Sequence, residues 1–371
     1  MPLRSRVAVA AFLFLPCAFG LVPSAFRPVP LTAFQARSPG RLEVLKAIGS
    51  LPPAVVGLFR EPIGFKQTAI GDYFVFDRRG HTVYSVDENG AASRKLVQIG
   101  AEDGRVIEPS AFDVAANGSF AVADAPNGRE RIQLFDATGV RTGGFLLPGR
   151  GASRIVLGSL SLNGVGTLTF TGRTLVMSHP ESGWLLSEFG LAGTPIRSVG
   201  QLRSTGHESD RELHLALNAG IPIPDPKGGF YFVFMAGPPA FRKYDADGEL
   251  VYERTIQGRE IDPVVAAMPN RWPRRESSGD EVPLVVPTIR TAAVDPAGRL
   301  WISFVVPFTY VYDGDGEKIR TVQFRGAGVI APSSLSFGNR GPRLPAPAAR
   351  PRSRPPGAPR SDRSAPVQGA A

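Results

Sequence analysis

The stretch PSAFDVAANGSFAVAD, residues 109–124, decides the fold. Its first part, 111–114, alternates apolar and polar residues as a half-buried strand does, and 120–123 is continuously apolar. Between them stand Asn117 and Gly118, a pair typical of a tight hairpin turn in which both central residues take positive φ. The stretch therefore predicts a β-hairpin whose second strand lies in the core.

The same frame opens six times along the chain. Each copy carries a glycine between its first strand and the segment that follows, and these are Gly71, Gly118, Gly172, Gly228, Gly298 and Gly341. An apolar second strand follows the first five, and a third strand then ends in an Asp-x-x-Gly turn in four copies, at Asp87, Asp136, Asp245 and Asp313. Aspartate at the first turn position caps backbone N–H groups, so we interpret these four residues as turn caps rather than as catalytic groups.

Four strands per unit, repeated at spacings of 47, 54, 56, 70 and 43 residues, predict an all-β, six-bladed β-propeller of four-stranded antiparallel blades. A β-sandwich also alternates short strands with turns, but it does not require one four-strand frame to recur. The sixth copy starts in register with a first strand at 335–337, and then becomes rich in proline and arginine. We therefore expect an incomplete last blade and a disordered tail over 342–371, and we attribute the break to a shifted reading frame near residue 338.

The motif at 109–124, followed by Arg131 to Gly139, resembles an NHL repeat. The resemblance extends over residues 60 to 341 and is specific in the second copy only. The first copy keeps Asp77 at the position of Asp124, whereas the later copies carry Ser178, Phe234 and Phe304 there. Similarity to secreted bacterial six-bladed propellers implies a fold and a tendency to bind ligands, and it implies no single reaction.

The N-terminus predicts export. Arg4 and Arg6 precede an apolar run from Val7 to Val22, which is short for a membrane span and typical of a signal peptide over residues 1–25. An uncleaved anchor is the alternative. The next segment, 26–60, contains an apolar stretch at 54–59 that we expect to close the ring as a strand, before the propeller at 61–341.

The net charge of +9 is concentrated at the two ends of the chain. Residues 338–371 carry +6 and the leader +2, which leaves +1 for the body, so we expect no nucleic-acid partner. The only cysteine is Cys17, in the leader, so the mature chain is expected to form no disulfide or thiolate metal site. These features predict a secreted or periplasmic protein that has no membrane span after cleavage and is a monomer.

Two sets of residues are candidates for a site. The first is the basic segment around a tryptophan in the long connection before the fifth copy, namely Arg271, Trp272, Arg274 and Arg275. Such a segment can hold an anionic or sugar-like ligand by stacking and paired hydrogen bonds, although the tryptophan is also the kind of residue that anchors its own loop. The second set consists of the histidines, His81, His179, His207 and His214.

Zinc needs three or four converging ligands, and no His-x-His or His-Glu-x-x-His spacing prepares such a site here. We therefore expect no cofactor, with zinc or calcium as the alternative. The sequence favours a binding or scaffolding module that acts through its loop face on a protein, small-molecule or carbohydrate ligand. A metal-dependent lyase or lactonase with its site at the central channel is the competing hypothesis.

Overall fold

The computed structural model describes residues 42–46, 55, 57–68, 71–90, 92–147, 154–157, 160–163, 167–277, 280–325, 332, 334–338 and 341–343. The chain divides into two compact units, Met1–Pro39 and Gly40–Ala371, and every described residue belongs to the second. The predicted leader and nearly all of the predicted tail therefore lie outside the described residues.

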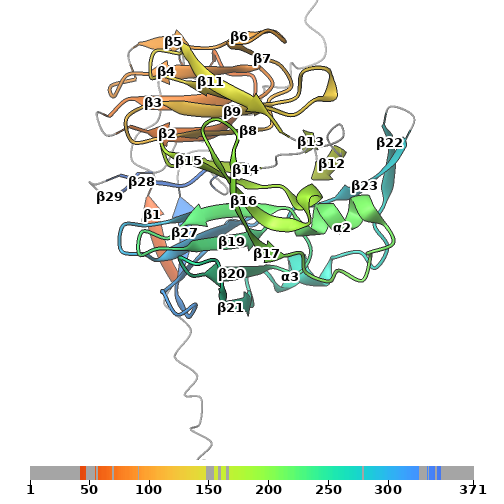
Figure 1. Ribbon diagram of the computed structural model, residues 1–371. Coiled ribbons are helices and arrows are strands. Elements are labelled where there is room, and N and C mark those ends of the chain that lie inside the picture. Colours follow the sequence, from red (N-terminus) through yellow and green to blue (C-terminus); the bar gives the residue numbers. More distant parts are fainter. Residues whose placement is uncertain are drawn as a thin grey trace, which may run out of the picture. The chain divides into compact units, whose positions relative to one another are not determined.

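Five sheets, each of four consecutive antiparallel strands, make up most of this unit (Figure 1). The first two are β2 (Pro62–Gln67), β3 (Tyr73–Asp77), β4 (Thr82–Val86), β5 (Ser93–Lys95) and β8 (Ala111–Val114), β9 (Phe120–Asp124), β10 (Arg131–Phe135), β11 (Arg141–Leu146). The third and fourth are β14 (Thr167–Phe170), β15 (Thr174–Ser178), β16 (Trp184–Gly190), β17 (Pro195–Gln201) and β18 (Gly220–Pro224), β19 (Phe230–Phe234), β20 (Ala240–Tyr244), β21 (Leu250–Thr255). The fifth is β24 (Ile289–Val294), β25 (Leu300–Phe304), β26 (Thr309–Tyr312) and β27 (Lys318–Arg325).

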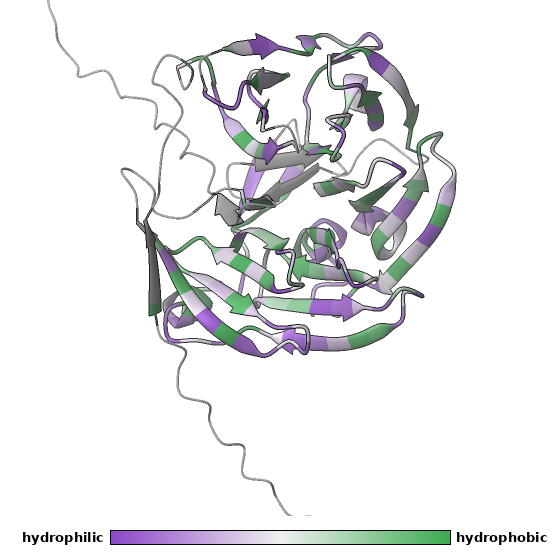
Figure 2. Ribbon diagram, turned by 90° about the vertical axis from the view of Figure 1, so that its left-hand side faces the viewer, coloured by the Kyte–Doolittle hydropathy of each residue, from purple (hydrophilic) through white to green (hydrophobic). Residues whose placement is uncertain are grey.

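The innermost strands of the five sheets contact one another in chain order, from β2 through β8, β14 and β18 to β24. The sheets are therefore blades arranged about a common centre, as Figure 2 shows, and the fold is a β-propeller. The described residues form five complete blades, not the six that the sequence predicts. The sixth copy appears only as a hairpin of β28 (Ser336–Gly338) and β29 (Gly341–Arg343).

The second strand of each blade supplies the core, as the sequence predicts. All five residues of β19 and of β25 are buried, and the same holds for β9. Aromatic rings join strands within a blade and across neighbouring blades. Phe120 stacks on Phe135 at 4.9 Å between centroids, and Phe76 of the first blade stacks on Phe112 of the second at 5.3 Å. Burial of one such side chain contributes about 1.5–3 kcal/mol, so the blades are held face to face mainly by apolar packing.

The hairpin at Asn117 and Gly118 differs from the prediction in its turn type. Gly118 has a φ of +84°, whereas Asn117 does not take positive φ. Instead the Asn117 side chain accepts the backbone N–H of Ser119 at 3.1 Å, and Gly118 donates to the carbonyl of Ala115 at 2.9 Å. The polar side chain stabilises an ordinary right-handed turn, so only its last position needs a glycine.

The N-terminal segment also differs from the prediction. Of the stretch 54–59, the described residues form a turn in which Leu58 N–H donates to the carbonyl of Val55 at 3.1 Å. Val55 packs on the first blade and the Phe59 ring meets Tyr84 at 5.2 Å, so burial of these side chains holds the segment in the turn. The strand that the segment does supply is β1 (Leu42–Lys46), which pairs in parallel with β27 at the outer edge of the fifth blade.

The connections between blades carry the remaining elements. They include short strands β6 (Gln98–Ile99) and β7 (Arg105–Val106), and helices α2 (Arg211–Asn218) and α3 (Asp262–Ala266). They also form an accessory sheet, which is made of β12 (Arg154–Leu157), β13 (Leu160–Asn163), β22 (Arg274–Ser277) and β23 (Asp280–Val285). No helix in the described ranges is both long and apolar enough to cross a membrane.

Candidate functional site

The two ends of the blades differ in how their strands are connected. We call the end with the turns from first to second and from third to fourth strand the tight-turn face. Asp136 is typical there: its Oδ1 accepts the backbone N–H groups of Thr138 at 2.8 Å and Val140 at 3.0 Å, and Gly139 closes the turn with a φ of +89°. A hydrogen bond from the Thr138 hydroxyl, with those backbone bonds, lowers the pKa of Asp136. The prediction that the Asp-x-x-Gly residues are turn caps is confirmed.

The opposite end, which we call the long-loop face, carries all the connections between blades. There α2, α3 and the accessory sheet lie on one side of the blades, at the right in Figure 1. β12 comes from the connection before the third blade and pairs in parallel with β23, which comes from the connection before the fifth. Helix α2, from the connection between them, contacts both strands. Three connections that are distant in sequence thus build one structure.

Two buried aspartates attach these connections to their blades. Asp77, at the end of β3, accepts the backbone N–H groups of Arg60 and Glu61 at 2.8 Å each. Asp124 holds the same position in β9 and accepts the N–H of Ile107 at 3.2 Å. Each carboxylate therefore fixes the segment that enters its own blade. In the later blades a serine or phenylalanine stands at this position.

Asp124 also forms a buried ion pair with Arg131. The Arg131 Nη2 lies 2.7 Å from Asp124 Oδ2, and its side chain is 9% exposed. The guanidinium also donates to the carbonyls of Ala101 and Arg105, and its Nη1 lies 3.4 Å from Asp103 Oδ1. The hydrogen bond to Asp124 raises the pKa of Arg131, so the guanidinium stays charged at neutral pH.

Arg203 fastens α2 to the fourth blade and has no carboxylate partner among the described residues. Its guanidinium donates to the carbonyls of Leu217 at 2.9 Å, Ala236 at 2.7 Å and Pro238 at 3.1 Å, and lies 4.0 Å from the centre of the Phe234 ring. Burial lowers the pKa of Arg203 to about 10. The C-terminal end of α2 is thus held by hydrogen bonds that no local sequence pattern indicates.

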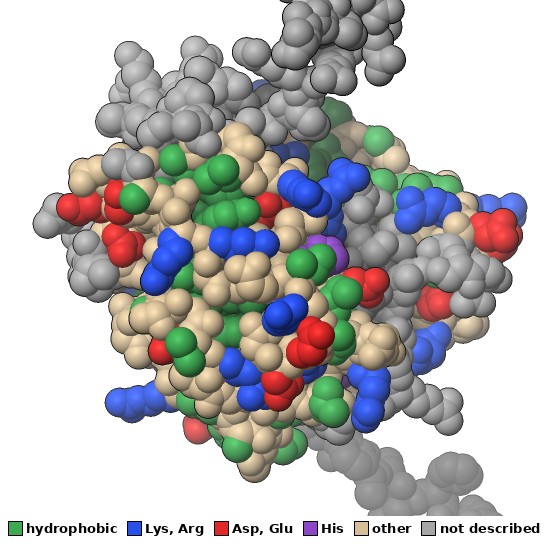
Figure 3. All heavy atoms as spheres, turned by 90° about the horizontal axis from the view of Figure 1, so that it is seen from above, with side chains coloured by type: hydrophobic (Ala, Val, Ile, Leu, Met, Phe, Trp, Pro, Cys, Tyr) green, Lys and Arg blue, Asp and Glu red, His purple; other side chains and the backbone are tan. Residues whose placement is uncertain are grey.

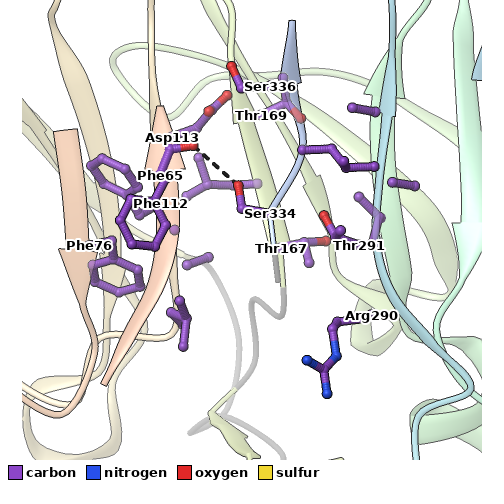
Figure 4. Close-up of a pocket in the computed structure, with 18 of the residues that line it drawn as sticks. Phe65, Phe76, Phe112, Asp113, Thr167, Thr169, Arg290, Thr291, Ser334 and Ser336 are labelled. Carbon is purple, nitrogen blue, oxygen red and sulfur yellow. Dashed lines mark hydrogen bonds between the residues drawn. The ribbon is translucent and has the colours of Figure 1, made fainter. Parts of the chain in front are cut away.

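A cavity of about 770 Å³ runs between the innermost strands. Its walls come from β2, β8, β14, β18, β24 and β28, so it is the central channel of the propeller. Most lining side chains are apolar, and Figure 4 shows several of the polar ones. A volume of this size is in the range of pockets that hold small organic molecules.

Several polar side chains in the channel form contacts across neighbouring blades. Lys66 Nζ lies 2.9 Å from Asp113 Oδ1, while Asp113 Oδ2 accepts the Phe170 N–H at 2.9 Å. Three hydroxyl groups donate to backbone carbonyls: Thr167 to Gly220 at 2.5 Å, Thr169 to Pro222 at 2.8 Å and Ser334 to Phe65 at 3.2 Å. An innermost strand has one unpaired edge, which explains why β18 tolerates two prolines and why side chains from the next blade satisfy its carbonyls.

Among the described residues, two arginines and one carboxylate line the long-loop end of the channel. Arg78 Nη2 lies 2.5 Å from Glu61 Oε1, and the Arg78 side chain is 16% exposed. The Arg78 Nε is buried and makes no hydrogen bond with any described residue. Arg290 is exposed and projects from β24 at the end away from Asp113 and Ser336 (Figure 4).

The four histidines lie on the long-loop face in separate local contacts. His81 follows β3 with a φ of 51°; burial lowers its pKa, and its Nδ1 is buried without a partner in the described part of the chain. His179 Nε2 lies 3.4 Å from Glu130 Oε2. His214, in α2, has its Nδ1 2.8 Å from the Thr205 hydroxyl, and His207 lies in the loop just before that helix. No group of three or more His, Cys, Asp or Glu able to hold a metal occurs among the described residues, and zinc or calcium binding stays a prediction.

The segment with Trp272 is anchored to α2. Trp272 is half-buried and packs against the apolar side chains of α2 and Val285. Arg274 pairs with Asp210, the N-cap of α2, and donates to the Glu281 carbonyl at 2.9 Å. Arg271 and Arg275 are exposed. Two of the four predicted ligand residues therefore make internal contacts, and ligand binding by this set stays a prediction.

Sequence reasoning did not identify the channel residues Lys66, Arg78, Asp113 and Arg290. Asp113 left a signal, because a carboxylate inside the apolar strand 111–114 is buried only when it is paired. No sequence signal marks Arg78 or Arg290 as a channel residue, since their positions in the channel follow from how the blades are arranged. On the side of the first blades, acidic and basic side chains are interspersed with apolar ones (Figure 3), in line with a body of nearly neutral charge.

Comparison with protein-family models gives no match, and comparison with the curated proteins gives none either. Among solved structures, the chain is similar to a streptogramin B lyase, with 13% identity, a TM-score of 0.45, and 76% of this chain and 90% of that chain covered. It is similar to virginiamycin B lyase from Staphylococcus aureus at 8% identity, a TM-score of 0.46 and 75% of each chain. A chain of a nidogen/laminin complex is similar at 10% identity and a TM-score of 0.44, over 71% of this chain and 80% of that one. These values describe a resemblance in fold and carry nothing about activity.

Proposed function

We propose that this propeller is a binding module that takes its ligand on the long-loop face, at the mouth of the central channel. The observation that carries the proposal is the difference between the two faces. Short capped turns occupy one face, whereas the other carries two helices, an accessory sheet and the arginine end of the channel. Binding residues in scaffolds of this kind are concentrated in the longer loops.

The proposal is tested by thermal shift with a panel of monosaccharides, dicarboxylates, nucleotides and short peptides. A ligand of the long-loop face should raise the melting temperature of the wild-type protein, and the shift should shrink in the double variant Arg271→Ala/Arg275→Ala. The matched control is Arg173→Ala/Lys227→Ala, which removes two exposed charges from the tight-turn face. A shift that is lost in the control and kept in the long-loop variant would contradict the proposal.

We also propose that the ring has six positions and belongs to the NHL class. β28 contacts both β24 and β2, the innermost strands of the fifth and first blades, and this is the place where a sixth blade belongs. Its residues agree with the first strand predicted at 335–337. Translation of the other two reading frames of the gene beyond residue 338 should reveal apolar strands and an Asp-x-x-Gly-like turn. Their absence from both frames would remove the frame-shift hypothesis.

Export is proposed from the leader, since Arg4, Arg6 and the apolar run 7–22 have the order of a signal peptide. Cell fractionation of the full chain should place the mature form outside the cytoplasm. Replacement of the run by polar residues should retain the protein inside. If the wild-type chain and the variant with the polar leader were distributed equally between the cytoplasm and the outside, export by this leader would be contradicted.

A further inference from the structure

We propose that Asn127 is a site of spontaneous modification, at which the nitrogen of Gly128 attacks the asparagine side chain and converts it to aspartate and isoaspartate. An asparagine followed by glycine is open to this reaction, because glycine has no side chain to hinder the approach of its nitrogen. The described part of the chain contains three such pairs in full, which are Asn89–Gly90, Asn117–Gly118 and Asn127–Gly128. Their surroundings differ, and the difference selects the third pair.

The reaction needs no partner other than water. The Gly128 nitrogen forms a bond to Cγ of Asn127, its proton is transferred to the departing amide nitrogen, and ammonia leaves. Water then opens the resulting cyclic imide at either carbonyl, which leaves aspartate or its isoaspartyl isomer at position 127. The nitrogen reaches Cγ only when the asparagine side chain is free to turn and the surrounding turn opens, so hydrogen bonds that hold either one slow the reaction.

At Asn117 both the side chain and the turn are held. Oδ1 of Asn117 accepts the backbone N–H of Ser119 at 3.1 Å and the Ser119 hydroxyl at 2.6 Å. Gly118 is buried, and its N–H donates to the carbonyl of Ala115 at 2.9 Å. The attacking nitrogen and the attacked amide are therefore both engaged in the folded chain.

At Asn89 a carboxylate holds the turn. Asp87 Oδ1 accepts the N–H of Asn89 at 3.1 Å, and Asp87 Oδ2 accepts the N–H of Ala92 at 2.8 Å. Gly90 is buried, and its N–H donates to the carbonyl of Asp87 at 2.9 Å. This turn therefore opens only when the bonds to the Asp87 side chain are broken as well.

The turn at Asn127 is held by its backbone alone. It lies between β9 and β10 on the long-loop face, and no side chain in the described ranges caps its start at Ala125. Two backbone bonds close it, from Gly128 to Ala125 and from Arg129 to Pro126 at 3.1 Å each. The Asn127 side chain is exposed and makes no hydrogen bond with any described residue. Its amide is therefore free to turn toward the next nitrogen.

The surroundings of this turn also leave room for the reaction. Gly128 is exposed, and a Cβ added there would meet nothing within 4 Å. Asn127 itself has a φ of 55°, in the left-handed region that is strained for residues other than glycine. The base of the loop is fixed by the ion pair of Asp124 and Arg131, so the turn can open while the blade stays intact.

The test incubates the full chain in a mildly alkaline buffer and follows each asparagine by peptide mass spectrometry, in which the conversion adds about 1 Da. Asn127 should convert about fivefold or more faster than Asn89 and Asn117, since one hydrogen bond changes an opening equilibrium by roughly that factor. In urea, where the turns are lost, the three should convert at similar rates. Ser119→Ala removes one contact of the Asn117 side chain and should accelerate conversion at Asn117 alone.

Gly128→Ala tests the attacking nitrogen. The added methyl group has space in the folded chain but hinders the approach to Cγ, so conversion at Asn127 should slow while the melting temperature changes little. Equal rates at the three asparagines in the folded chain, or no conversion at Asn127, would overturn the inference. A lead of Asn127 that persists unchanged in urea would also overturn it, because the adjacent residues and not the fold would then determine the rate.

Discussion

The tight-turn face and the long-loop face are built from the same strands and held together in different ways. In the fifth blade, Asp313 Oδ1 accepts the N–H of Glu317 at 2.9 Å and Gly316 donates back to the Asp313 carbonyl at 3.1 Å, so the turn is complete within five residues. On the long-loop face, Val156 pairs with Leu284 across more than a hundred residues of chain. One face is stabilised locally and the other depends on the finished ring.

The largest expected effect concerns the buried ion pair of the long-loop face. Asp124→Asn leaves Arg131 charged and buried, which should lower the free energy of unfolding by about 3–5 kcal/mol. The exposed turn cap provides the comparison, as Asp136→Asn on the tight-turn face should change the urea midpoint far less. Addition of Arg131→Gln to Asp124→Asn should restore part of the loss. Equal effects of the two single variants would break the contrast between the faces.

Two glycines with similar φ test the contrast at the level of the backbone. At Gly139, on the tight-turn face, a Cβ would lie 2.5 Å from the Leu96 carbonyl oxygen, whereas at Gly183, on the long-loop face, it would meet nothing within 4 Å. Gly139→Ala should therefore destabilise by about 2–3 kcal/mol and Gly183→Ala by about 1 kcal/mol, the cost of positive φ alone. Urea denaturation of both variants measures the difference. If Gly183→Ala were the more destabilising of the two, the tight turn at Gly139 would have to accommodate the added Cβ by a shift of its backbone.

The attachment of α2 should be a local property of the long-loop face. Arg203→Gln leaves the carbonyls of Leu217 and Ala236 without their donor and should cost about 2 kcal/mol. Hydrogen exchange should accelerate in α2 and remain unchanged in the tight turns. Arg211→Gln, which removes an exposed pair with Glu181 from the same helix, should have little effect. Faster exchange throughout the blades would show that Arg203 supports the ring as a whole.

The smallest effect is expected for a pH-dependent contact on the tight-turn face. Burial raises the pKa of Asp295, but hydrogen bonds from the Trp301 indole at 2.9 Å and from Arg299 outweigh it and hold the pKa below its usual value. The stabilisation is present above the unfolded-state pKa and is lost as the pH falls through the folded-state pKa. Asp295→Asn should therefore be less stable than the wild type at pH 7, and the difference between the two should be smaller at pH 3. Urea midpoints at both pH values, read from tryptophan fluorescence, check this, and a constant difference would contradict it.

Sequence patterns predicted the parts of the fold that are determined by residues close together in the sequence. The buried second strands and the aspartate-capped turns depend on residues within a few positions, and β9 and Asp136 agree with the prediction. The accessory sheet could not be predicted, because the pairing of β12 with β23 has no local signal. The channel residues could not be predicted either, because Arg290 and Arg78 line one channel only through the positions of the blades that carry them. The packing of Trp272 against α2 likewise depends on the tertiary fold and not on nearby residues in the sequence.

The hydrogen bond from Ser334 to the Phe65 carbonyl spans 269 positions of the sequence. During synthesis the first blade emerges long before β28 has been made. The side of the first blade that contacts β28 therefore stays uncovered until β28 can pack against it. Contacts of such long range slow folding, because the loop must close before they contribute. The final kinetic step of this protein should therefore be closure of the seam between the first blade and β28, and partly folded chains should expose that seam to aggregation.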